Sequence, residues 1–406
     1  MGRCENNLEY LFVAYTQIIA LKGKPNITHR LPLRIKSIFN NPPKIINCIH
    51  SVFEKQTIGS NPAIIHVLGK AFAWNHLNIV IMVNGRQVAR FSALNVRGTW
   101  VSLPHFDHGG LWIDWEITGA LGLSLSGNQQ ENAQIWHRQL MRCIVHFVNR
   151  TPLPRGRDHQ LCLSLTPDQI QKAASWPEGS AKVQYRSPFR ESENATGGKV
   201  VSFLPLITNQ ALTPAHFRQP IARKIRRAML HGLQAEVGEA SLLNDFYHVY
   251  RRNIKELGSF GLPEKFFYHL VNDWSHGHCL LVVVRHKGKA VGAGVLLTYN
   301  GMAENAWFAT LGRYNRMYVS YLLHFALMRE AARLGCHTYG MGRSTTGSSV
   351  HRYKKQWETN DQPLFFNATF AQKNPASLYP RLKNLLRLIP MPIAKIIDAW
   401  LTEKIY

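Results

Sequence analysis

The sequence has few cysteines, and no two of them stand at the spacing of a metal or redox site. Six cysteines are spread over 406 residues, and the nearest two are Cys143 and Cys162. Zinc ribbons and thiol–disulfide motifs place two cysteines about two to four residues apart. The sequence therefore predicts no zinc site and favours a reducing compartment.

Long apolar runs are also missing. No stretch reaches the roughly 18 residues that a membrane-spanning helix needs. Glu5 and Glu9 precede the first short apolar stretch, where a secretory signal would be basic. We therefore expect a cytoplasmic protein, and peripheral contact with the inner face of a membrane stays compatible with this.

Acidic residues are scarce relative to basic ones. The chain has 48 Lys and Arg against 24 Asp and Glu, which gives a formal net charge of +24. Residues 195–235 contain no acid, and five cations surround Pro220, namely Arg218, Arg223, Lys224, Arg226 and Arg227. Such a field attracts polyanions, for example tRNA, a nucleotide-linked donor or an anionic membrane face. The alternative is a solvated helix face in a generally basic proteome.

Two parts of the sequence repeat one order of elements: two strands across a tight turn, a third strand, a long helix and a closing strand. The first part has strands at 78–83, 88–96 and 99–103, a helix at 131–149 and a strand at 160–165. Its turn is Asn84-Gly85, a strong hairpin signal because both positions accept positive φ. The second part has strands at 279–285, 291–299 and 305–311, a helix at 318–334 and a strand at 337–341.

This repeat predicts two similar domains of the α/β class with mixed sheets, although a mixed chain of this size can show two such passes by chance. We expect a helical or irregular layer at 1–50, the first domain at 51–215, the second at 216–373 and a helical tail at 374–406. The tail carries Leu378, Leu382, Leu385 and Leu386 at helical spacing, among Lys and Arg. It either docks on the core or contacts a membrane.

Four segments carry more specific patterns. They are 101–110 (VSLPHFDHGG), 222–233 (ARKIRRAMLHGL, a predicted helix), 250–270 (YRRNIKELGSFGLPEKFFYHL) and 342–357 (GRSTTGSSVHRYKKQW). In this order they resemble segments of the FemAB-like proteins, in particular those that accompany exosortase and exopolysaccharide systems. The last segment is the most specific. The resemblance implies two tandem GNAT-like domains, that is, the acyl-CoA N-acyltransferase fold, over most of the chain.

The resemblance also implies an activity. FemAB-like acyltransferases move an acyl or aminoacyl group to an amine, here one on a cell-envelope, peptidoglycan or exopolysaccharide precursor. The donor is either aminoacyl-tRNA or acyl-CoA, and we expect no permanently bound cofactor. The phosphate-binding R/Q-x-x-G-x-G/A of CoA-using GNAT enzymes is missing ahead of the 318–334 helix, so acetyl-CoA has no positive support.

Lys354 is the main catalytic candidate. In the family signature an aromatic-Lys pair, here Tyr353-Lys354, is thought to place a cation near the scissile bond. A cation there stabilises the oxyanion that forms when an amine attacks an ester or thioester carbonyl. Without the motif, Lys354 could equally be a surface lysine beside Lys355. Trp357 ends the signature and is predicted, with Tyr353, to contact substrate.

Arg343, Ser344 and Gly347 follow the expected closing strand, where backbone N–H groups and a guanidinium can bind phosphate or carboxylate. Arg343 could instead hold the loop through carbonyl groups. Arg223 and Arg226 of the basic helix are predicted to bind the anionic part of a substrate.

The first domain contributes His105, Asp107 and His108. The resemblance implies that this segment lines the cleft, so Asp107 is predicted to orient the amine or act as a base. Two histidines three residues apart are weak evidence for a metal, and no metal site is predicted. Asp before Gly-Gly is also ordinary turn chemistry.

The sequence departs from the family pattern at three places. Gly340 stands where many relatives have Asp, Glu358 replaces the Gly after Trp357, and the Arg expected near Ala222 is Arg223. These changes leave the substrate and the activity open. The second hypothesis is a non-catalytic basic double-GNAT module that binds nucleic acid or an anionic membrane. In either case the cleft is expected near the junction of the two domains, under the basic helix.

Overall fold

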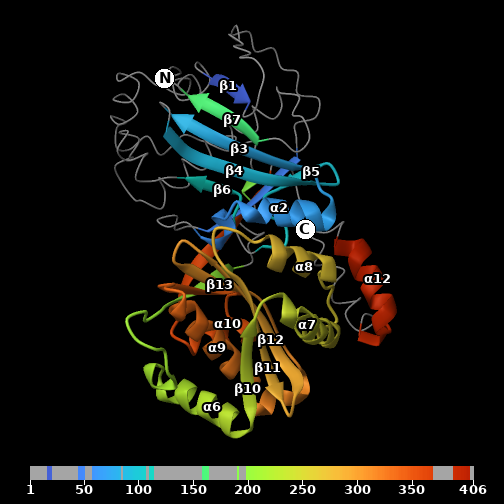
Figure 1. Cartoon of the computed structure of the whole chain (residues 1–406). Coiled ribbons are helices and arrows are strands. Elements are labelled where there is room, and N and C mark those ends of the chain that lie inside the picture. Colours follow the sequence, from blue (N-terminus) through green and yellow to red (C-terminus); the bar gives the residue numbers. More distant parts are fainter. Residues whose placement is uncertain are drawn as a thin grey trace.

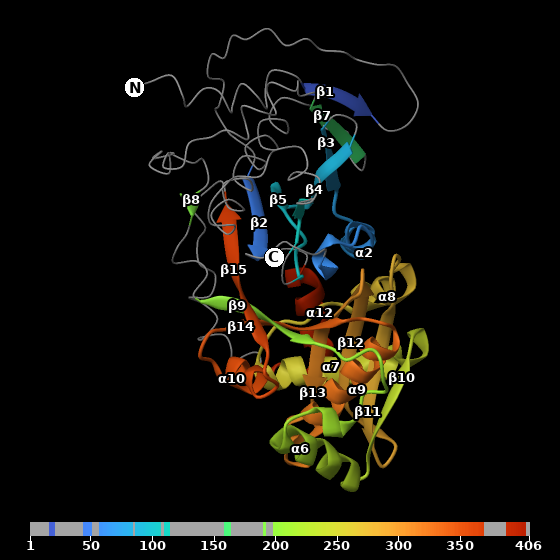
Figure 2. The same cartoon turned by 90° about the vertical axis from the view of Figure 1, so that its left-hand side faces the viewer.

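The structure, a computed structural model, describes residues 16–20, 44–50, 57–83, 86–106, 109–113, 158–163, 190–191, 198–368 and 387–402. Two lobes lie one above the other in Figure 1, and Figure 2 shows strands that run from one lobe into the other. The first lobe contains, in order across its sheet, β1 (Thr16–Ala20), β7 (Asp158–Leu163), β3 (His76–Val83), β4 (Arg86–Val96), β5 (Thr99–Val101) and β2 (Lys44–His50), with β6 (Leu111–Ile113) beside β4.

The second lobe continues the same strand order through β15 (Asn360–Ala368), β9 (Lys199–Pro205), β14 (Thr338–Thr345), β13 (Met302–Thr310), β12 (Lys289–Tyr299), β11 (Cys279–His286) and β10 (Leu233–Gly238), with β8 (Arg190–Glu191) beside β15. The strand β15 joins the lobes, because its residues 364–368 pair with β2 and its residues 360–363 pair with β9. The mixed α/β class expected from the sequence is therefore confirmed.

Helices cover both faces of the second sheet. The described helices are α2 (Ala63–Phe72), α6 (Gln219–Leu230), α7 (Leu243–Leu257), α8 (Glu264–Asp273), α9 (Val319–Arg333), α10 (Ser349–Lys355) and α12 (Met391–Thr402). Short 3₁₀ turns lie at η1 (Ile58–Ser60), η3 (Pro214–His216), η4 (Ala240–Leu242) and η5 (Gly312–Met317). None of the helices within the described ranges combines the length and the apolar character that crossing a bilayer takes.

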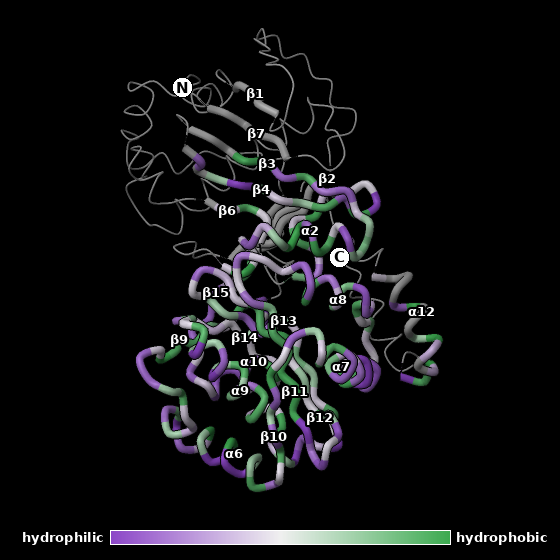
Figure 3. The backbone as a smooth tube through the Cα atoms, viewed as in Figure 1, coloured by the Kyte–Doolittle hydropathy of each residue, from purple (hydrophilic) through white to green (hydrophobic). Residues whose placement is uncertain are grey.

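The continuous apolar run of β11 follows from this layering. Leu281 and Val283 point into a core with α7 and α8, whereas Val282 and Val284 point into a second core with α6 and α9. A strand covered on both faces loses the polar alternation of a half-exposed strand. Figure 3 shows the resulting apolar residues along the central strands. The first of these cores also takes in α2, so the two lobes share it.

The predicted strands of the two copies follow in the expected order, but their closing strands take different positions in the sheet. In the second lobe the closing strand β14 pairs in parallel with the third strand, β13. In the first lobe the closing strand β7 pairs in parallel with the first strand, β3, and β2 takes the place beside β5. Element order along the chain does not determine which sheet edge a strand joins. The predicted helix at 131–149 and the turn at 84–85 lie outside the described residues.

Three segments differ from the expected boundaries. The layer expected to be helical or irregular at 1–50 contributes strands β1 and β2, and β9, ahead of position 216, joins the second lobe. Helix α6 begins at Gln219, a turn before the expected start. Pro220 fits in its first turn because backbone N–H groups there have no partner within the helix.

Candidate functional site

The signature segment 342–357 follows the point where two parallel strands separate. Hydrogen bonding between β13 and β14 is confined to residues 302–304 and 338–340. The pairing of β14 with β9 then shifts between Gly340 and Arg343, and Gly342 has a φ of 72°. This β-bulge turns consecutive carbonyl groups of β14 out of the ladder. The carbonyl groups of Gly342 and Arg343 become acceptors for a side chain of α10.

Lys354 occupies this bulge. Its side chain is buried, with 5% of its surface exposed, and Nζ donates to the carbonyl oxygens of Gly342 (2.6 Å) and Arg343 (3.0 Å). A buried ammonium is tolerated when such dipoles replace its water. The structure thus places Lys354 as a fixed positive charge where β13 and β14 part. The reading as a solvated surface lysine is excluded.

His324 of α9 lies beside this charge and is neutral. Its ring stacks on Phe308 at 4.2 Å between centroids, and Nδ1 lies 3.2 Å from the hydroxyl of Tyr339. Burial, and then the positive charge of Lys354, lower the pKa of His324 to about 3. At neutral pH the His324 ring therefore carries no charge. Sequence reasoning missed His324 because a histidine within an apolar helix face carries no local signal.

Tyr353 and Trp357 form an aromatic wall with two residues of α9. The ring centroid of Trp357 lies 5.9 Å from that of Tyr321 and 5.7 Å from that of His324. The ring of Tyr353 lies 5.3 Å from Tyr321. Burial raises the pKa of the Tyr353 hydroxyl above its ordinary value. Both predicted aromatic residues are thus brought together with Lys354 and packed in the core.

A pocket of about 200 Å³ opens next to Trp357. Its walls come from the end of β9, the segment before and into α6, and the connection from α10 to β15. The lining combines apolar side chains with polar groups, including Leu204, Leu212, Phe217, Arg218, Trp357 and Glu358. Arg218 and Glu358 lie 3.4 Å apart and both are exposed. This pocket could not be predicted from the sequence, because residues 204–221 on one side and 356–360 on the other are distant in the chain.

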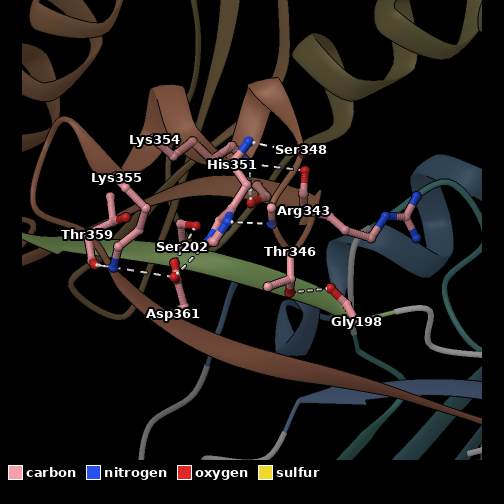
Figure 4. A network of polar contacts seen from close by, with 12 residues as sticks. Gly198, Ser202, Arg343, Thr346, Ser348, His351, Lys354, Lys355, Thr359 and Asp361 are labelled. Atoms are coloured by element: carbon pink, nitrogen blue, oxygen red, sulfur yellow. Dashed lines mark hydrogen bonds and ion pairs between the residues drawn. The ribbon is translucent and has the colours of Figure 1, made fainter.

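The predicted anion-binding residues lie in different surroundings. The side chain of Arg343 is exposed and points away from the other labelled residues in Figure 4. Ser344 is buried, and its hydroxyl has no hydrogen-bond partner among the described residues. Gly347 lies in the exposed loop before α10.

The structure does not bring Arg223 and Arg226 to Lys354, since both lie on the exposed face of α6. The cation of this helix that reaches the aromatic wall is Lys224. Its Nζ donates to the Tyr321 hydroxyl (2.8 Å) and to Oε1 of Gln356 (3.0 Å).

His105 belongs to the core that the two lobes share. Its ring centroid lies 5.3 Å from that of Phe72 and 5.8 Å from that of Trp74. Burial lowers its pKa to about 4, opposed by a hydrogen bond with the backbone of Thr402. Asp107 and His108 lie outside the described residues. Across the described part of the chain, no three His, Cys, Asp or Glu side chains gather as a metal site would need.

Gly110 is expected to be irreplaceable for steric reasons. Its φ is 101°, and a Cβ there would lie 2.1 Å from Cβ of Ser102. We expect Gly110→Ala to lower the free energy of unfolding by at least about 2 kcal/mol, from clash and backbone strain together. Gly98→Ala is the matched control, because Gly98 has a φ of 81° but open space around it. Equal losses in urea unfolding of the two variants would contradict the clash.

Comparison with known proteins identifies the fold of the second lobe. Residues 215–355 match the family model described as an acetyltransferase (GNAT) domain. This part of the chain is therefore similar to a GNAT domain. It contains three of the four family-like segments, the last of them up to Lys355. The GNAT fold expected from the sequence is confirmed here.

Solved structures give more distant likenesses to this chain. FemX is similar at 12% identity and a TM-score of 0.47, over 82% of this chain and 97% of that chain. L-PGS from Bacillus licheniformis is similar at 10% identity and a TM-score of 0.33, over 50% of this chain and 67% of that chain. At these identities the likeness concerns the fold alone. No curated protein gives a significant match.

Proposed function

We propose that this GNAT protein transfers an acyl or aminoacyl group to an amine of a cell-envelope, peptidoglycan or exopolysaccharide precursor. The observation that carries the proposal is the buried ammonium of Lys354, fixed at the bulge where β13 and β14 part. In the reaction the amine nitrogen attacks the donor carbonyl, a C–N bond forms, and the C–O or C–S bond breaks. The amine loses a proton and the leaving group gains one.

The fixed charge suits the hardest step of this reaction. Negative charge develops on the carbonyl oxygen during attack, and a preorganised cation in a water-poor site stabilises it without reorganisation. His324 is neutral beside it and does not compete as a second cation. In this proposal Arg343 and Ser344 bind the anionic part of the donor, Tyr353 and Trp357 line the site, and Asp107, with His105 and His108, orients the amine.

The donor is aminoacyl-tRNA or acyl-CoA, and one experiment separates them. The full-length protein is incubated with an amine-bearing envelope precursor and either aminoacyl-tRNA or acyl-CoA, and the amide product is sought by mass spectrometry. Amide from aminoacyl-tRNA alone selects the aminoacyltransferase, and amide from acyl-CoA alone selects the acyltransferase. The absence of amide with either donor, while the protein is folded, contradicts the proposed function.

One observation favours the second candidate, a non-catalytic basic module. Arg223, Arg226, Arg227 and Leu230 stand at positions i, i+3, i+4 and i+7 of α6, and Leu230 is 85% exposed. These spacings place them on one helix face. No ion pair within the described ranges involves the three arginines. Such a face fits nucleic acid or an anionic membrane. Binding to the membrane would hold the protein at its inner face.

Replacing all three arginines by glutamine tests this module. We expect at least about tenfold weaker binding to tRNA or to phosphatidylglycerol vesicles, with less dependence on salt. The control replaces Lys287 and Lys289 of the β11–β12 turn by glutamine. A module of this kind tolerates Ala at Lys354 and Asp107, whereas the proposed enzyme does not.

A further inference from the structure

The loop between β14 and α10 is held by His351 and Asp361, two residues that take no part in the proposed reaction. The backbone N–H of Gly347 donates to Nδ1 of His351 at 3.0 Å. On the other side of the ring, Nε2 lies 2.9 Å from Oδ2 of Asp361, at the start of β15. Figure 4 shows the ring between the loop and the strand. His351 therefore links the loop that follows Arg343 and Ser344 to the sheet.

The two contacts fix the state of the ring. A backbone N–H can only donate, so Nδ1 of His351 must carry the lone pair. The proton of the neutral ring is then on Nε2 and is donated to Asp361. A ring with both nitrogens protonated would lose the acceptor for Gly347. The arrangement thus needs one tautomer, and the carboxylate of Asp361 selects it.

Asp361 is itself held in place as a carboxylate. The Ser202 hydroxyl of β9 donates to its Oδ1 at 2.7 Å, and Nζ of Lys355 lies 3.3 Å from its Oδ2. Burial opposes ionisation, but the hydrogen bonds from His351 and Ser202 and the charge of Lys355 outweigh it, so the pKa of Asp361 is lowered. The acceptor for His351 is thereby charged and oriented from both sides.

Other contacts also hold the loop, through Thr346 and through the carbonyl group of Gly347. The N–H of Thr346 donates to the carbonyl of Gly198 at 2.8 Å. Nη1 of Arg352 donates to the carbonyl of Gly347 at 2.6 Å. The carbonyls of Gly342 and Arg343, at the start of the same segment, are bound by Lys354. His351 and Lys354 stand three residues apart on α10, so one helix holds both ends of the segment.

We propose that His351 and Asp361 are positioning residues: they hold the loop 345–348, which follows directly on Arg343 and Ser344 at the end of β14, and so keep these two residues in place for the donor. This proposal rests on the proposed transfer reaction only in its claim that Arg343 and Ser344 bind the donor. The relay from Gly347 through His351 to Asp361 is what ties the loop to β15. Neither residue touches the reacting atoms.

Two substitutions at one position separate the two halves of the relay. In His351→Asn the amide oxygen can take the place of Nδ1 and keep the acceptor for Gly347. In His351→Gln the longer amide reaches the place of Nε2 and keeps the contact with Asp361, but the acceptor for Gly347 is lost. His248→Gln is the control, since His248 is exposed on α7.

The first readout is hydrogen exchange of the Gly347 amide in the full-length protein. We expect the Gly347 amide to exchange about tenfold faster in His351→Gln, because one hydrogen bond is lost. In His351→Asn we expect exchange to be less than about threefold faster. Asp361→Asn, which can no longer select the tautomer by its charge, is expected to resemble His351→Gln. Equal exchange in the Asn and Gln variants, or no change in either, overturns the proposal.

The second readout is kinetic. With the donor that supports amide formation, His351→Gln is expected to raise KM for the donor about tenfold while kcat changes less than about threefold, and His351→Asn is expected to restore KM. A fall in kcat alone in both variants overturns the positioning role. The exchange readout does not need transfer, so failure of the proposed function would leave it intact and the two failures are distinguishable.

Discussion

Lys354→Met is expected to lower kcat for amide formation by about 100- to 1000-fold, the range found when one preorganised oxyanion-stabilising group is removed. Methionine has a similar length and no charge, so it removes the cation and leaves the packing of α10 nearly unchanged. The measurement is single-turnover formation of the amide with saturating donor. Lys354→Arg keeps the charge in a bulkier, planar group, so its kcat is expected to lie between those of the wild type and Lys354→Met.

The same change affects stability, and the two effects must be separated. Without the ammonium, the carbonyl groups of Gly342 and Arg343 lose a donor, which costs about 1 to 3 kcal/mol in the free energy of unfolding. Circular dichroism and urea unfolding show whether the variant is folded under assay conditions. Lys289→Met is the matched control, since Lys289 is exposed in the β11–β12 turn. A folded Lys354→Met protein with transfer within threefold of the wild type would make the lysine purely structural.

Local patterns predicted the parts of the fold that local physics decides. The strands at 279–285 and 291–299 and the helix at 318–334 agree with β11, β12 and α9 within a few residues. Their signals are turn residues between apolar runs and helical periodicity, which act over a few positions. The signature segment could be located for the same reason, because its residues are contiguous.

Features that depend on distant parts of the chain could not be predicted in this way. The pairing of β7 with β3 could not be predicted, because no residue within β7 indicates which strand it joins. Arg223 was expected at the substrate, whereas Lys224 reaches the aromatic wall, because one helical position turns a side chain by about 100°. Leu378, Leu382, Leu385 and Leu386 of the predicted tail lie outside the described residues, but α12 beyond them docks on the second lobe.

The docking of α12 depends on a buried ion pair, and breaking it is expected to give the largest loss of stability. Nη1 of Arg251 on α7 donates to Oδ2 of Asp398 on α12, and the two side chains are only 3% and 6% exposed. Asp398→Ala leaves the guanidinium buried without its counter-charge. We expect the free energy of unfolding to fall by about 3 to 5 kcal/mol, measured by urea denaturation.

Two control variants test whether the loss comes from the unpaired buried charge. Lys70→Ala breaks the pair of Lys70 with Asp273, whose side chains are 56% and 23% exposed, and is expected to cost less than about 1 kcal/mol. The double variant Arg251→Met with Asp398→Leu removes both charges and fills the space with apolar atoms, so it is expected to recover most of the loss. A double variant as unstable as Asp398→Ala would show that the pair itself, rather than the unpaired charge, holds α12 on α7.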